Sequence, residues 1–132
     1  MDLKKEYGTD KKKEVEGIWE DFGSGIKLKI ARWNNPGFRD MFANELAKNP
    51  RKFRNKKSTD PVMKDLQIRC CATHVLKDWK NVDWNGSKNV EYSVELGIEV
   101  LTELPDFYDE VVGIANNFEN FRQETEDADK GN

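Results

Sequence analysis

The chain contains 132 residues, of which 36% are hydrophobic and 36% are charged, and it carries a net charge of −3 at pH 7. A chain of this length fits one domain, and its four tryptophans and seven phenylalanines supply the large side chains that a core needs. The acidic balance argues against a protein that coats nucleic acid or an anionic membrane, because both functions favour a basic excess. No window approaches the roughly 20 apolar residues that cross a bilayer, so we expect a cytosolic protein without membrane association.

The two ends of the chain differ in composition from its middle. Residues 1–16 are mostly charged and contain little apolar surface, which predicts a flexible or weakly docked N-terminal arm. Residues 123–132 are acidic and lack aromatic or branched apolar side chains, so we expect a disordered acidic tail. Because no repeat or linker interrupts the chain between these ends, residues 17–122 are predicted to form a single compact domain.

A hairpin is predicted near the start of this domain, where two short strand-like runs flank Gly23-Ser24-Gly25. The second run, Ile26-Lys27-Leu28-Lys29-Ile30, alternates apolar and basic residues as a half-buried strand does. We therefore expect a β-hairpin over residues 18–31. Both a two-residue and a three-residue turn fit the glycines, so the register stays open at this point.

Helix signals dominate the rest of the chain. Asn35-Pro36 and Asp60-Pro61 each combine a capping side chain with a proline for the first turn, and Ser93 and Asp106 also suit cap positions. Gly97, on an apolar helix face, predicts the close approach of another helix. Together with the apolar periodicity, these signals predict helices over about 36–48, 61–79, 94–104 and 106–122. The expected fold class is α+β and mostly helical, with an N-terminal β-hairpin followed by about four helices.

The last of these helices carries the most regular amphipathic pattern. Its apolar residues recur in steps of four and three: Phe107, Val111, Ile114, Phe118 and Phe121. Such a stripe is more typical of a core, but an aromatic-rich helix near a terminus is also a face that binds a partner. These five residues are therefore the candidate protein-binding site.

Chemistry-bearing residues are few. His74 follows Cys71 by three positions and Cys70 by four, which makes a Cys–His pair on one helix conceivable. No third group or oxyanion site accompanies the pair, so buried thiols beside a surface histidine are the favoured interpretation. One histidine and two adjacent cysteines do not form a zinc site. We expect no enzymatic activity, no catalytic or metal residues and no cofactor.

A basic run from Arg51 to Lys57 is the one feature that resembles a nucleic-acid site, with Phe53 placed to stack on a base. A solvated loop between helices is favoured over nucleic-acid binding because the chain is acidic overall and lacks a known binding motif. Contact with an acidic protein surface is a further alternative.

The order of several short motifs resembles the tail assembly chaperones of long-tailed bacteriophages and prophages, from about residue 15 to Phe121. The usual pattern has a longer turn containing Asp and Gly before the Tyr-Ser pair, where this chain has Trp84 to Val90. The motifs are Gly17-Ile18-Trp19, Ile30-Ala31-Arg32-Trp33-Asn34-Asn35-Pro36-Gly37-Phe38, Val75-Leu76-Lys77-Asp78-Trp79-Lys80-Asn81-Val82, Tyr92-Ser93, Leu101 and Pro105-Asp106-Phe107.

This resemblance implies a protein of the host cytoplasm that binds the tape measure protein, keeps it soluble and assists polymerisation of the tail tube. It also implies absence from the mature virion. Members of that family often have a longer, frameshifted product that recruits the tail tube protein. Self-association of the chain is a further possibility that the sequence leaves open. A structural minor tail or neck protein retained in the virion is the main alternative function, and nucleic-acid binding through residues 51–57 is less favoured.

Overall fold

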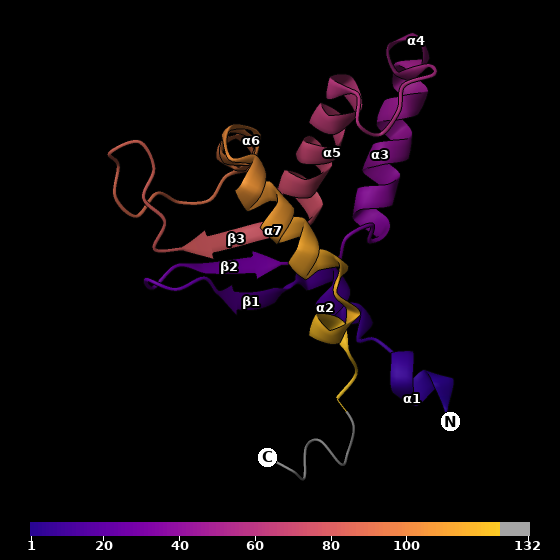
Figure 1. Ribbon diagram of the computed structural model, residues 1–132, viewed down its shortest axis with the longest axis vertical. Helices are drawn as coiled ribbons and strands as arrows, with labels where there is room; N and C mark the ends of the chain where they lie inside the picture. Colours follow the sequence, from indigo (N-terminus) through magenta and orange to yellow (C-terminus); the bar gives the residue numbers. More distant parts are fainter. Residues whose placement is uncertain (125–132) are drawn as a thin grey trace.

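A computed structural model describes residues 1–124 of the chain, and its α+β, mostly helical fold confirms the predicted class (Figure 1). A small sheet lies beside a group of helices. The elements are α1 (Leu3–Tyr7), α2 (Lys11–Glu16), β1 (Ile18–Asp21), β2 (Lys27–Ile30), α3 (Pro36–Lys48), α4 (Pro50–Phe53), α5 (Pro61–His74), β3 (Leu76–Lys80), α6 (Val94–Glu103), α7 (Pro105–Asn116) and the 3-10 helix η1 (Phe118–Phe121).

The predicted hairpin is formed by β1 and β2, which pair in antiparallel register with Ile18 opposite Ile30. The amide of Phe22 donates to the carbonyl of Ile26, so the turn consists of the three residues Gly23 to Gly25. Both glycines have positive φ, of 79° and 80°, which glycine adopts at little cost. The three-residue alternative is therefore the correct one.

The prediction of one helix over residues 61–79 is wrong at its C-terminal end. Helix α5 ends at His74, and the chain continues as β3, which pairs antiparallel with β2 and completes a sheet of order β1-β2-β3. Trp79 lies opposite Leu28 in this sheet, with both side chains buried. Its helical spacing from Ile68 is therefore a coincidence of short apolar runs, which periodicity alone does not assign to helix or strand.

The last predicted helix, over 106–122, is also shorter than expected. Helix α7 ends at Asn116, where Asn117 adopts an extended conformation and its side chain accepts a hydrogen bond from the amide of Glu119. The following η1 changes the direction of the apolar stripe. The helix predicted over 36–48 is confirmed, and the one predicted over 94–104 ends one residue earlier, at Glu103.

The N-terminal segment, predicted to be a flexible or weakly docked arm, forms two short helices that are tied to the C-terminal end of the described chain. Asp2 and Asp10 cap α1 and α2, and the amide of Asp10 donates to the carbonyl of Phe121 at 2.7 Å. The amide of Gln123 donates to the carbonyl of Gly8, so this segment is tied to the C-terminal end of the described chain. Helix caps and long-range backbone hydrogen bonds hold this segment in place, although it contributes little apolar surface to the core. The predicted acidic tail lies, from residue 125 on, outside the described residues.

Helix α5 occupies the centre of the core and contacts α3, α6 and β3. In Figure 1 it stands between α3 and α4 on one side and α6 and α7 on the other. Its buried residues are Leu66, Ile68, Cys70, Cys71 and Ala72. In residues 1–124 no helix is long and apolar enough to cross a membrane.

Candidate protein-binding surfaces

The predicted stripe on the last helix does not form one exposed face. Val111 and Phe121 are fully buried, whereas Phe107, Ile114 and Phe118 are partly exposed. Phe118 packs against Tyr7 of α1, with ring centroids 5.5 Å apart. The stripe is therefore largely core, and only its partly exposed members remain accessible to a partner.

Phe107 belongs to an apolar cleft of about 210 Å³ between the sheet and the α6–α7 junction, which we call the sheet-side cleft. Leu104, at the junction of the two helices, leaves 43% of its surface exposed beside it. The phenyl ring of Phe107 packs edge-on against Phe22 of the hairpin, with centroids 6.0 Å apart. The cleft is lined by Ile26, Leu28, Trp79, Val82, Asp83, Trp84, Val100, Leu104 and Phe107.

Two indole hydrogen bonds fix the outer wall of this cleft. The Trp79 indole donates to the carbonyl of Val90, and the Trp84 indole donates to the Glu99 carboxylate, each at 2.8 Å. They hold the loop between β3 and α6 against the core, so the cleft is formed without a partner. The apolar lining offers no group for acid–base chemistry beyond the exposed Asp83.

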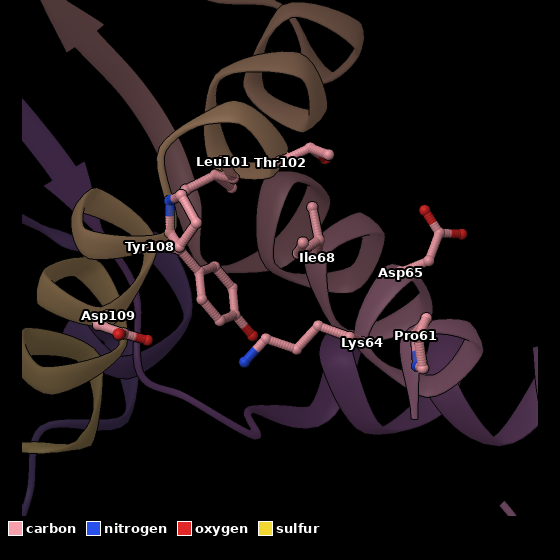
Figure 2. Close-up of a pocket in the computed structure, with 9 residues that line it drawn as sticks. Pro61, Lys64, Asp65, Ile68, Leu101, Thr102, Tyr108 and Asp109 are labelled. Carbon is pink, nitrogen blue, oxygen red and sulfur yellow. The ribbon is translucent and has the colours of Figure 1, made fainter. Parts of the chain in front are cut away.

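A second cleft, of about 420 Å³, lies on the other side of the α6–α7 junction, against α5, and we call it the helix cleft (Figure 2). Its floor consists of Ile68, Leu101 and Tyr108, which are nearly completely buried. Asp65 and Asp109 stand on opposite sides of it in Figure 2. An apolar floor with carboxylates at its rim suits a side chain that combines an apolar stem and a positive end.

The basic run from residue 51 to 57 forms α4 and the turn that follows it. Phe53 is only 8% exposed because it packs into the core, so its ring is not free to stack on a base. The lysines and arginines around it are exposed to solvent. The structure thus leaves a charged surface there, without the aromatic platform that the sequence suggested.

The thiols of Cys70 and Cys71 are fully buried. Burial raises the pKa of Cys70 to about 11 and the pKa of Cys71 to about 12, so both thiols are protonated at neutral pH. Burial and the charge of Lys77 lower the pKa of His74. In the part of the chain that the structure describes, no group of three or more histidine, cysteine or acidic side chains is placed to hold a metal ion.

Sequence reasoning missed both clefts because their walls come from segments far apart in the chain. The only local signals were Trp84 in a loop and Leu104 before a proline, and neither by itself indicates a cavity. The strand β3 was needed to bring Trp79 to the sheet-side cleft.

Comparison of the sequence with known protein families gives a match over most of the chain. A family model described as "YdaY prophage protein" matches residues 33–132, from the loop before α3 onward. No curated protein and no solved structure matches the chain. The match spans more than half of the sequence and supports the expected phage or prophage origin. The chain therefore belongs to the YdaY prophage protein family.

Proposed function

We propose that this protein is a non-enzymatic tail assembly chaperone that binds the tape measure protein in the host cytoplasm and keeps it soluble. The prophage family and the order of sequence motifs that resembles tail assembly chaperones support this proposal. The observation that carries it is the sheet-side cleft, an apolar docking site beside the exposed Leu104 and the partly exposed Phe107.

The chemistry of the cleft suits a helical partner. An amphipathic helix presents apolar side chains at intervals of three and four residues, and such side chains are the usual anchors in an apolar groove. The small volume of the cleft, about 210 Å³, accommodates few anchors. Binding through few anchors is weak at any one site and reversible. Many copies can then cover a long helical protein and leave when tube subunits replace them.

The test is a pull-down of the co-expressed tape measure protein of the same prophage with two matched variants. Leu104→Glu places a carboxylate in the lining of the sheet-side cleft, and Val94→Glu also replaces an exposed apolar side chain with glutamate, at a residue that is 39% exposed and outside the cleft. We expect Leu104→Glu to lower the affinity at least about tenfold, because an unpaired carboxylate would be desolvated on binding. Val94→Glu should bind as the wild type does.

Equal binding by the wild type and Leu104→Glu, with both proteins folded by circular dichroism, would contradict the assignment of the cleft. The competing function is that of a structural tail or neck protein. Such a protein stays in the mature virion, whereas a chaperone does not. Peptide mass spectrometry of purified particles should find no peptide of this chain if it is a chaperone. Stoichiometric recovery of the chain from particles would favour the competing function.

A further inference from the structure

The C-terminal helices present a uniformly acidic surface. From Asn89 to Phe121 the sequence contains no lysine or arginine. None of the carboxylates of α6 and α7 forms an ion pair with another residue in the range 1–124. The acidic residues of this stretch, all of them exposed, are Glu91, Glu95, Glu99, Glu103, Asp106, Asp109, Glu110 and Glu119, and of these only Glu119, beyond α7, forms an ion pair within the described chain, with Arg122 at 3.3 Å.

The opposite charge is concentrated at the end of the α3–α5 hairpin, which we call the basic tip (residues 48–57). The tip contains six lysines and arginines and no carboxylate. Within the described chain only two of them pair, Lys48 with Glu45 at 3.8 Å and Lys56 with Asp60 at 4.0 Å. Figure 1 shows α4 at the far end of this hairpin, where the tip projects from the body of the molecule.

The helix cleft lies within the acidic side and already holds one basic side chain. The Lys64 ammonium lies 4.8 Å from the centre of the Tyr108 ring, a cation–π geometry. Figure 2 shows these two side chains meeting across the cleft, from α5 and α7. The apolar floor accepts methylene stems, and Asp109, which forms no ion pair within residues 1–124, stands where a positive end would lie, whereas Asp65 already pairs with Arg69 at 3.4 Å. The cleft is thus suited to lysine and arginine side chains from outside.

The tip and the cleft of one molecule do not meet. Helix α5 separates α3 and α4 from α6 and α7, and no residue of the basic tip lines the helix cleft. The two surfaces are complementary in charge, and the one ion pair between the tip and the start of α5, Lys56 with Asp60 at 4.0 Å, leaves the helix cleft itself unfilled by the tip. A contact between them therefore requires two molecules.

We propose that the basic tip of one copy docks into the helix cleft and acidic rim of a second copy, so that the protein self-associates through this contact. A second copy is favoured over nucleic acid because Phe53 is buried and cannot stack on a base, and because the acidic surface around the cleft repels phosphate. The contact joins two different surfaces, so it forms either a reciprocal dimer or a longer assembly.

The test is a charge-swap experiment followed by sedimentation equilibrium at low ionic strength. The tip variant is Arg51→Glu with Arg54→Glu, and the cleft variant is Glu103→Lys with Asp109→Lys. None of these four side chains forms a hydrogen bond or ion pair within residues 1–124. A control, Lys5→Glu with Lys27→Glu, changes the net charge as the tip variant does but lies outside both surfaces.

We expect the wild type and the control to associate at low salt and to dissociate as salt rises, because exposed charge pairs are screened. Each charge-swap variant alone should associate at least about tenfold more weakly, because the tip variant lowers the charge of the tip from +6 to +2 and the cleft variant puts two lysines among the carboxylates of the acidic rim. An equimolar mixture of the two variants should associate more tightly than either variant alone, because the two new carboxylates of one variant can pair with the two new lysines of the other, and the unaltered tip and cleft can also meet.

A wild type that stays monomeric at low salt, or a mixture that fails to associate while both variants are folded, would overturn the proposal. Binding of a single-stranded oligonucleotide by a monomeric wild type, lost in the tip variant, would instead assign the tip to nucleic acid. The proposal is independent of tape measure binding, which is placed at the sheet-side cleft on the other side of the α6–α7 junction. Failure of one therefore leaves the other unchanged.

Discussion

Asn35 is a buried polar side chain that joins two helices, with only 5% of its surface exposed. Its carbonyl oxygen accepts from the amide of Phe38 and caps α3. Its amide nitrogen donates to the carbonyls of Arg32 and His74, each at 2.8 Å. The sequence Asn35-Pro36 predicted the cap, since capping depends on neighbouring residues. It could not predict the bond to His74, which depends on how α5 packs against α3.

Replacing Asn35 with aspartate separates the capping of α3 from the hydrogen bonds that the side-chain nitrogen donates. Asn35→Asp keeps the capping oxygen but removes both donated hydrogen bonds and brings a carboxylate against two buried carbonyls. We expect the free energy of unfolding to fall by about 1–3 kcal/mol, measured by urea denaturation. Asp60→Asn, at the cap of α5, is the control. Asp60 accepts from the amide of Val62, which an asparagine oxygen can replace, and its ion pair with the exposed Lys56 is long at 4.0 Å, so the change should be below about 0.5 kcal/mol. Equal stability of Asn35→Asp and the wild type would show that the donated bonds contribute nothing.

At the scale of elements, the join between α5 and α6 depends on Tyr92. Its hydroxyl donates to the carbonyl of Ala72 near the C-terminal end of α5, and its ring lies edge-on to Trp79 with centroids 4.8 Å apart. Gly97 of α6 is buried against the same ring. The sequence predicted that Gly97 permits a close approach, but the group that approaches is the Tyr92 side chain. Helical periodicity identifies an apolar face and does not specify its neighbour.

The two helical glycines in this region should respond in opposite ways to alanine. A Cβ at Gly97 would lie 2.5 Å from the Tyr92 hydroxyl oxygen, which is held by its bond to Ala72. Gly97→Ala should therefore lower the free energy of unfolding by about 1–3 kcal/mol through overpacking. A Cβ at Gly113 of α7 meets no atom within 4 Å, so Gly113→Ala should raise it by about 0.5–1 kcal/mol through helix propensity. Thermal and urea unfolding measure both changes, and a stabilised Gly97→Ala would refute the packing argument.

At the scale of the whole molecule, charge was visible in the sequence but its arrangement was not. The basic run of residues 51–57 and the acidic residues of α6 and α7 could be counted directly. Only the fold places them on opposite sides of α5. For the apolar stripe of the last helix, too, the sequence shows the pattern and only the fold shows which residues are buried. The stripe's helical period holds in α7 as far as Ile114, whereas Phe118 and Phe121 lie in η1, and the burial of Phe121 depends on the helix ending at Asn116 and on the packing of η1.

The two proposals assign separate surfaces to different partners, the apolar sheet-side cleft to a helical partner and the charged tip and helix cleft to a second copy. A chaperone that coats a long protein benefits from both, because neighbouring copies that contact each other raise the effective concentration of the next binding site. The proposed tail assembly role within the YdaY prophage protein family does not depend on self-association, because it rests on the sheet-side cleft and on the order of the sequence motifs.

The most direct test of that role is the soluble fraction of the tape measure protein of the same prophage, expressed with and without this chain. We expect the soluble fraction to rise severalfold with the chain present, and the two proteins to co-purify with many copies of the chain per tape measure protein. An unchanged soluble fraction and no co-purification, with the chain itself folded, would contradict the chaperone proposal.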